Sequence, residues 1–261
     1  MQFLEFVILR FPLPELHQVT AGQKILQHPF VRLIQGKTVL KRFQKFLGCL
    51  LRCAQTELPL QVSADDLGYG DVHALNPERG KIATPCLDRL AGQGMTFTDA
   101  HSGSSVCTPT RYGVITGRYA WRTKLQSSVL GGLSPRLIEQ GRLTVPAFLK
   151  QNGYSTACVG KWHLGMDWVK KGEVTELGIE SAAQVNNVDY AQPIANGPTS
   201  VGFDTYFGIS ASLDMVPYCF IENDHVVANP TETMKLIMNK GVAVSYTREG
   251  PGSPGFRGED V

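Results

Sequence analysis

Three stretches of this chain repeat one pattern: a threonine, a proline within the next two residues, and an apolar segment that ends at a glycine. They are residues 84–94, 108–117 and 144–153. Threonine is a good helix N-cap, proline fits the first helical turn, and glycine adopts the left-handed conformation that ends many helices. Each stretch therefore predicts a helix capped by its threonine, which in the second stretch is Thr108.

Segments typical of strands follow two of these helices. Residues 95–98 alternate between apolar and polar side chains, and residues 154–160 ("YSTACVG") predict a buried strand. The sequence of residues 217–227 predicts a hairpin that turns at an Asn-Asp pair. Alternating helices and strands indicate an α/β fold with a mixed, mostly parallel sheet and helices on both faces. Ligands bind beyond the carboxyl ends of such strands, where "GKWHLG" (160–165) falls.

Composition and charge exclude several classes of protein. The chain has 261 residues, its net charge is +2, and it has no apolar run long enough for a membrane span. We therefore expect no nucleic-acid partner and no transmembrane helix. Its six cysteines form no Cys-x-x-Cys pair, which argues against a disulfide scaffold or a zinc site and predicts that most are buried. Residues 1–60 are basic and without motifs, so we expect an N-terminal extension ahead of a domain at 61–261.

Two adjacent carboxylates, Asp65 and Asp66, precede a glycine-rich turn in "SADDLGYGD". At the bent end of a strand, both can converge on one hard divalent cation such as Ca²⁺ or Mg²⁺. Asp71 and His73 are weaker candidates for the same site. The alternative is a solvated turn without a metal.

A second group combines a cysteine with positively charged side chains. Cys107 stands at the predicted start of a helix, and Arg111 follows one turn later, so both the helix dipole and the guanidinium favour a negative charge there. Lys161 and His163, two residues apart on an extended strand end, point the same way and suit an anionic substrate. A surface lysine and a core histidine are the alternative. A cysteine-based phosphatase would have its arginine at position 113, which is Gly113.

Three motifs occur in a definite order: "ADDLGYGD", "VCTPTRYGVITGR" and "GKWHLG". They resemble the N-terminal signature motifs of the type I sulfatases, the arylsulfatase family of the alkaline-phosphatase-like superfamily. The resemblance covers residues 64 to about 230 and leaves residues 1–60 unmatched. It implies that residues 61–261 are the N-terminal portion of a sulfatase catalytic domain, truncated before the second pair of metal ligands and the C-terminal part.

The resemblance implies a role for each matching residue. A separate maturation enzyme would oxidise Cys107 to Cα-formylglycine, whose hydrated aldehyde is the nucleophile and also a metal ligand. Asp65 and Asp66 match ligands of Ca²⁺, with Mg²⁺ as an alternative ion. Arg111 matches the arginine that holds the formylglycine.

The remaining matches concern the substrate. Lys161 and His163 match residues that bind the sulfate and the diol oxygens, and Ser212 in "ISASLD" matches, more weakly, a serine near the sulfate. The resemblance implies hydrolysis of a sulfate ester on a small molecule or polysaccharide, in a periplasmic, secreted or lysosomal compartment. Two alternatives stay open: a phosphonate or phosphodiester hydrolase of the same superfamily, and an inactive truncated remnant of a sulfatase.

Overall fold

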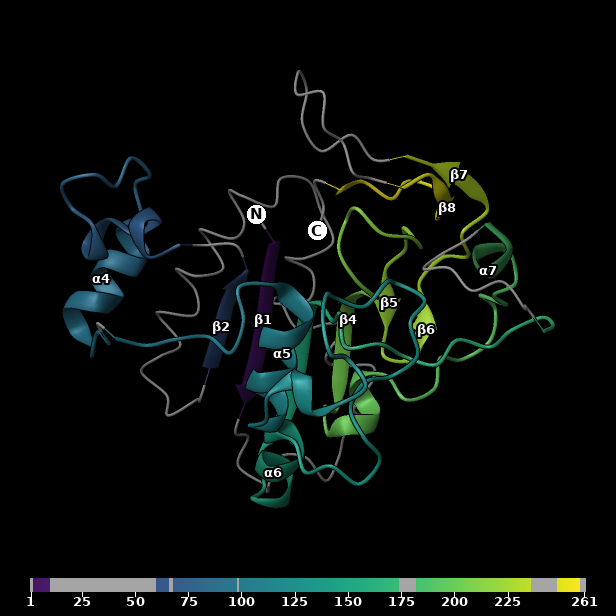
Figure 1. Cartoon of the computed structure of the whole chain (residues 1–261), viewed down its shortest axis with the longest axis horizontal. Helices are drawn as coiled ribbons and strands as arrows, with labels where there is room; N and C mark the ends of the chain where they lie inside the picture. The colour runs from purple at the N-terminus through teal and green to yellow at the C-terminus, as the bar shows by residue number, and fades with distance from the viewer. Residues whose placement is uncertain are drawn as a thin grey trace, which may run out of the picture.

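A six-stranded sheet forms the centre of the computed structural model (Figure 1). The residues that the structure describes are 2–9, 60–65, 68–97, 99–173, 182–235 and 248–258. The strands of the sheet are β1 (Gln2–Leu9), β2 (Leu60–Asp65), β3 (Ser155–Lys161), β4 (Thr205–Ile209), β5 (Ile221–Glu222) and β6 (His225–Val226). A separate pair consists of β7 (Glu232–Met234) and β8 (Gly250–Gly252).

The sheet is mixed, and its strand order is β2-β1-β3-β4-β5-β6. Strands β3 and β4 are parallel, whereas the other neighbours are antiparallel. The α/β class with a mixed sheet is therefore confirmed, but the parallel majority is not found among the described strands. The difference has two causes: β1 lies antiparallel between β2 and β3, and the β5–β6 hairpin returns along the opposite edge. That hairpin, with a left-handed Asn223 at its turn, was predicted correctly.

The α-helices are α4 (Pro85–Gln93), α5 (Cys107–Thr116), α6 (Val145–Gln151) and α7 (Ala182–Asn186). Short 3₁₀ turns are η2 (Tyr69–Asp71), η3 (His73–Leu75), η4 (Ala120–Arg122) and η5 (Pro198–Val201). Helix α6 begins as predicted, because Thr144 Oγ1 accepts the Ala147 N–H at 3.3 Å. Helix α5 ends as predicted at a left-handed Gly117, whereas Gly94 after α4 is extended.

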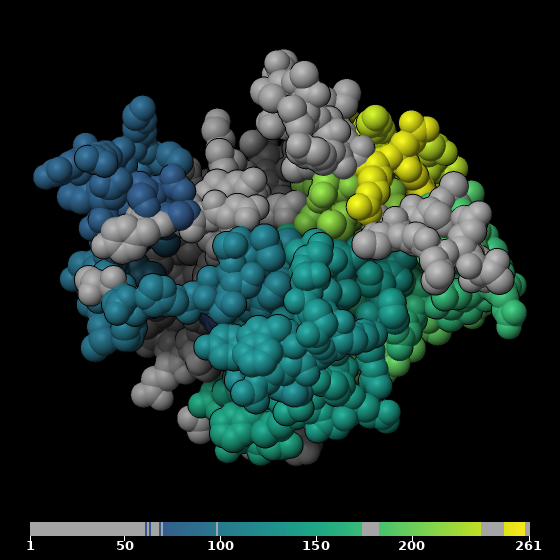
Figure 2. Space-filling view, in the orientation of Figure 1, coloured from purple at the N-terminus to yellow at the C-terminus, as the bar shows by residue number. Residues whose placement is uncertain are grey.

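Two local predictions were wrong. Thr108 is the second residue of α5 rather than its cap, which is Val106. Residues 95–97 form no strand: the side chains of Met95 and Phe97 are 79% and 70% exposed, and an alternating segment stays a strand only where one face is buried and an edge is available for pairing. Residues 68–97, with α4, form a lobe at the β2 side of the molecule, drawn in blue in Figure 2.

The main core lies against β3 and β4. Trp162 contacts Phe203 edge-on and Tyr206 at a tilted angle, with ring centroids 6.4 and 6.5 Å apart. Cys158 and Cys219 are buried in the same cluster, as expected of most of the cysteines, while Cys107 is only half-buried. Within the described segments, no helix has the length and apolar character needed to span a membrane.

Candidate functional site

The carboxyl ends of β3 and β4 meet at one edge of the sheet. Lys161 ends β3 opposite Ile209, which ends β4. The segments that follow β3 and β4 stay hydrogen-bonded beyond the strands. The Trp162 N–H donates to Ile209 O at 3.0 Å, and the His163 N–H donates to Ser210 O at 2.9 Å. This edge is where the order of helices and strands predicts a ligand site.

Lys161 and His163 are both buried at this edge, with exposed fractions of 2% and 0%. They do not continue an extended strand: His163 has a φ of 57°, so the argument from alternating strand positions was wrong for the second residue. Its Nε2 lies 2.6 Å from Leu130 O. A carbonyl oxygen only accepts hydrogen bonds, so Nε2 carries the hydrogen, and in the neutral ring the lone pair is on Nδ1.

Helix α5 brings Cys107 and Arg111 to the same edge. Cys107 is the first helical residue, half-buried at the end where the helix dipole is positive. Arg111, one turn later, is 3% exposed, and its Nη1 donates to Lys161 O at 2.6 Å. This hydrogen bond connects the first turn of α5, which holds Cys107 and Arg111, to Lys161 at the end of β3.

Ser212 lies in the segment that follows β4, two residues beyond the Ser210 carbonyl that holds His163. Its side chain is buried, and its carbonyl accepts the Met215 N–H at 3.0 Å. Ser212 therefore lies on the segment that leaves this edge after β4, and its role at a sulfate stays a prediction.

The predicted metal ligands are only partly described. Asp65 ends β2, and the pairings Gln2–Asp65 and Leu4–Gly160 put this end at the same sheet edge as Lys161. Because β1 lies between the two strands, their backbones are about 10 Å apart, or two strand spacings. Asp66 lies outside the described residues. The chemistry of an adjacent carboxylate pair fits a hard divalent cation, which takes six to eight oxygens in the case of Ca²⁺.

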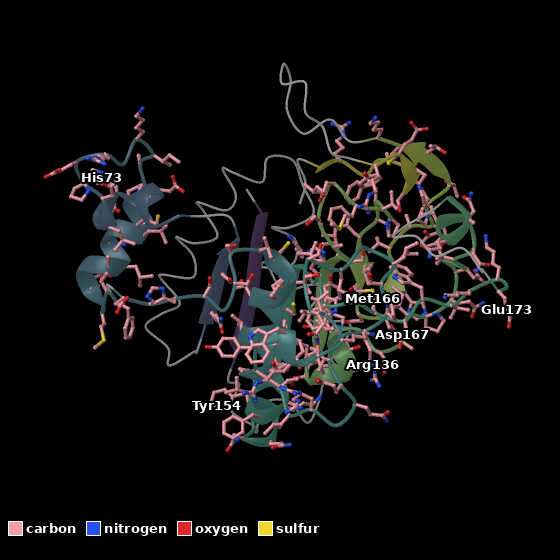
Figure 3. The ribbon with its side chains drawn as sticks, in the orientation of Figure 1. His73, Arg136, Tyr154, Met166, Asp167 and Glu173 are labelled. Carbon is pink, nitrogen blue, oxygen red and sulfur yellow. The ribbon has the colours of Figure 1, made fainter. Side chains whose placement is uncertain are left out.

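The weaker metal candidates lie elsewhere. Asp71 Oδ2 accepts the Gly68 N–H at 2.9 Å inside the α4 lobe, and Figure 3 shows His73 in that lobe, far from Met166 and Asp167. Across the described ranges, no three or more His, Cys, Asp and Glu side chains gather in a way that could hold a metal ion.

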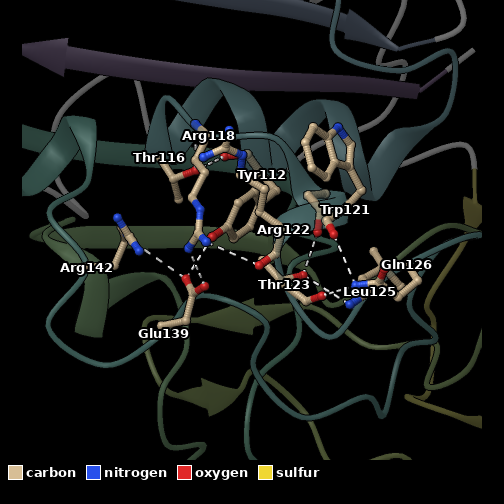
Figure 4. Close-up of polar contacts among 11 residues, drawn as sticks. Tyr112, Thr116, Arg118, Trp121, Arg122, Thr123, Leu125, Gln126, Glu139 and Arg142 are labelled. Carbon is tan, nitrogen blue, oxygen red and sulfur yellow. Dashed lines mark hydrogen bonds and ion pairs between the residues drawn. The ribbon is translucent and has the colours of Figure 1, made fainter.

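The structure also reveals a network that sequence reasoning missed (Figure 4). Glu139 accepts hydrogen bonds from the Tyr112 hydroxyl at 2.7 Å and from Arg118 Nη1 at 2.9 Å, and Arg142 Nε lies 3.7 Å away. Burial and the Glu139 hydrogen bond raise the pKa of Tyr112. Since Tyr112 follows Arg111, the network anchors the helix that presents Cys107. The two hydrogen bonds to Glu139 join residues 21 and 27 positions apart, so no local sequence pattern predicts them.

A second missed cluster supports the turn after the site. Asp167 accepts the Arg136 N–H at 3.0 Å and the Asn196 amide at 2.6 Å, and Arg136 Nη1 donates to Asn196 Oδ1 at 2.9 Å. Figure 3 shows Arg136, Met166 and Asp167 close together in the same region. These contacts fix the segment that continues from "GKWHLG".

Known proteins match this chain over the region that holds the site. The family model Sulfatase matches residues 60–236. The N-acetylgalactosamine-6-O-sulfatase of Bacteroides thetaiotaomicron is 39% identical over 168 residues, which are 64% of this chain and 29% of that protein. Arylsulfatase A of Bos taurus is 40% identical over 107 residues, 41% of this chain and 21% of that protein.

A solved structure from work on the metabolism of glycosaminoglycans by Bacteroides thetaiotaomicron agrees with the fold. It superposes with a TM-score of 0.52 at 37% identity, over 67% of this chain and 33% of the other. The chain thus spans less than a third of the length of these two curated relatives. The family model covers more than half of the chain, from the first residue of β2 to beyond Ser212, and the chain therefore belongs to the sulfatase family.

Proposed function

We propose that this chain carries the nucleophile-bearing part of a sulfuric ester hydrolase that uses a formylglycine made from Cys107. The observation that supports this most directly is the hydrogen bond between α5 and the last residue of β3. Arg111, on the first turn after Cys107, donates to the carbonyl of Lys161, so that two buried cations and the half-buried cysteine share one sheet edge.

Each side chain has a role that follows from its chemistry. Arg111 and Lys161 supply positive charge in a region shielded from water, which favours a sulfate and the charge that develops on its oxygens during transfer. His163 presents Nδ1 as a proton acceptor, because Nε2–H is held by Leu130 O. Ser212 contributes a hydroxyl that donates to a sulfate oxygen.

Two further components complete the proposal. A separate maturation enzyme would make the formylglycine from Cys107. Its hydrated aldehyde would supply a nucleophilic hydroxyl that displaces the alcohol of the ester, and a second hydroxyl whose deprotonation would expel the sulfate and restore the aldehyde. Asp65, Asp66 and the modified Cys107 would hold Ca²⁺, or Mg²⁺, which polarises the sulfate and favours ionisation of the attacking hydroxyl.

The proposal also includes a substrate class, which a relative supports, and a location. Because a relative of 39% identity is an N-acetylgalactosamine-6-O-sulfatase, we propose a sulfate ester on a sugar or polysaccharide rather than an unsulfated phosphodiester. A periplasmic, secreted or lysosomal compartment is part of the same proposal.

The test is to coexpress the whole chain with a formylglycine-generating enzyme and to measure peptide mass and turnover. We expect the Cys107 peptide to lose the mass that separates CH₂SH from CHO, and 4-nitrophenyl sulfate to be hydrolysed with Ca²⁺ but not after chelation. Cys107→Ala should abolish both signals without unfolding the chain. Cys86→Ala, which changes another half-buried cysteine in the α4 lobe, is the matched control.

Three results would contradict the proposal in different ways. An unmodified Cys107 would exclude the formylglycine. Faster turnover of an aryl phosphodiester than of the aryl sulfate would favour the phosphodiester hydrolase. A fully modified chain without turnover on either substrate would identify it as an inactive remnant.

A further inference from the structure

Thr108 is completely buried beside the proposed nucleophile, although it does not cap its helix. Its Oγ1 accepts the backbone N–H of Leu130 at 3.2 Å, across 22 residues of sequence. A buried threonine hydroxyl in the first turn of α5 therefore serves a distant segment rather than the helix end.

The carbonyl group of Leu130 contacts His163, a residue of the proposed site. The carbonyl oxygen accepts the Nε2–H of His163 at 2.6 Å. Leu130 is thus held at its N–H by the helix that begins with Cys107, and it holds the imidazole at its carbonyl. The two hydrogen bonds connect the nucleophile position and His163 through the backbone of one residue.

The segment that contains Leu130 is closely fixed by its surroundings. In residues 130–134, which we call the strap, Ser134 O accepts the Met166 N–H at 3.1 Å, and Gly132 O accepts the Trp168 indole N–H at 3.2 Å. A Cβ on Gly132 would lie 2.0 Å from Val216 O. The strap is therefore packed at Gly132 and Ser134 between the segment after β3 and the segment after β4, whereas the Leu130 N–H is held by the Thr108 hydroxyl.

We propose that Thr108 is a positioning residue for His163, which it orients through Leu130. This inference rests on the proposed function only in taking His163 as a site residue. The hydroxyl fixes the Leu130 backbone, the Leu130 carbonyl keeps the hydrogen on Nε2, and the neutral ring then has its lone pair on Nδ1. Partners of this kind behind a functional histidine set its tautomer and ring orientation.

Removing the hydroxyl has a defined local consequence. Without the Thr108 acceptor, the part-buried Leu130 N–H would lose its hydrogen bond, and the Leu130 backbone would rotate to reach another acceptor. The Leu130 carbonyl would turn with it, and the imidazole would then exchange between its two tautomers. Thr108→Ser retains the hydroxyl, whereas Thr108→Val keeps the shape of the side chain and removes the acceptor.

The experiment reads the tautomer directly on the whole, unmodified chain. Long-range proton–nitrogen NMR spectra of ¹⁵N-labelled protein distinguish Nε2–H from Nδ1–H histidines, and loss of a signal in His163→Gln assigns it. We expect Nε2–H in the wild type and in Thr108→Ser, and averaged nitrogen shifts in Thr108→Val and Thr108→Ala. Thr110→Val is the matched control, because its hydroxyl donates to Ser104 O on the other side of the helix start.

Several outcomes would overturn the proposal. They are an Nδ1–H tautomer in the wild type, unchanged His163 shifts in Thr108→Val, and loss of the folded amide spectrum in both Thr108→Val and Thr108→Ala, which would show a purely structural role. Where the matured chain turns over an aryl sulfate, we expect Thr108→Val to lower kcat about tenfold with little change in KM. The NMR result needs no formylglycine, metal or turnover, so it can fail or succeed independently of the proposed function.

Discussion

Replacement of Glu139 by glutamine tests whether the network behind α5 stabilises the fold through charge. In the native structure this carboxylate accepts from Tyr112 and Arg118 and lies beside Arg142 (Figure 4). Burial acts to raise the pKa of Glu139, but hydrogen bonds from Tyr112 and the backbone, with Arg142 and Arg118, outweigh it and hold the pKa below its ordinary value of 4.5. The folded state therefore favours the ionised form.

The size of the effect follows from the contacts. Hydrogen bonds to a charged group contribute about 1.5 to 3 kcal/mol, and exposed ion pairs about 1 kcal/mol or less. Because the Glu139 side chain is 38% exposed, solvent screening reduces these values. Glutamine still offers an oxygen to Tyr112, so only the contribution of the charge is lost. We expect Glu139→Gln to lower the free energy of unfolding by about 1 kcal/mol at pH 7.

The pH dependence gives the sharper test. A carboxyl group whose pKa is lowered in the folded state stabilises the fold fully above pH 4.5, and this contribution is lost as the pH falls through the folded-state pKa. Urea unfolding followed by circular dichroism should therefore show a difference between wild type and Glu139→Gln at pH 7 that is smaller at pH 3. Glu78→Gln, at an exposed position in the α4 lobe, is the control. An equal difference at both pH values would refute the electrostatic account.

Two further predictions concern packing and thiol reactivity. Gly132→Ala should cost about 1 to 3 kcal/mol in thermal unfolding, because its Cβ would overlap Val216 O, whereas Gly92→Ala, which has open space in α4, should not destabilise the chain; equal effects would contradict the packing of the strap. Burial raises the pKa of Cys158 and raises that of Cys219 to about 12, so iodoacetamide at pH 8 should modify Cys107 in the folded chain and reach the two buried thiols only in urea. Peptide mass analysis that found Cys158 or Cys219 modified in the folded state would be inconsistent with their burial.

The features that sequence predicted well are those set by neighbouring residues. The segment that became β3, the Thr144 cap of α6 and the Asn223 turn of the β5–β6 hairpin each depend on a few adjacent side chains. The order of the three motifs was sufficient to indicate the family, which the family model confirms. The sheet edge at which Lys161 and His163 lie was also predicted from the pattern of strands and helices.

The features that sequence reasoning missed depend on distant partners. Thr108 has the chemistry of a cap, but α5 begins two residues earlier than predicted, with Val106 as its cap, and the Thr108 hydroxyl instead accepts the N–H of Leu130, 22 residues away. His163 has a left-handed backbone, and two other segments hold it, Ser210 O at the backbone N–H and Leu130 O at the ring. Residues 95–97 alternate as a strand would, but only tertiary packing decides whether such a segment has a neighbour to pair with.

The backbone bonds from Trp162 and His163 to Ile209 and Ser210 determine when the edge of the sheet can form during protein synthesis. A nascent chain that has reached only residue 200 contains all three signature motifs but lacks the two carbonyls that hold "GKWHLG" in place. Domains generally fold as units as the chain emerges, and pairings distant in sequence close late because of the entropy of the loop between them. The histidine of the third motif therefore acquires its geometry after β4 has been made, well after the cysteine of the second motif has been translated.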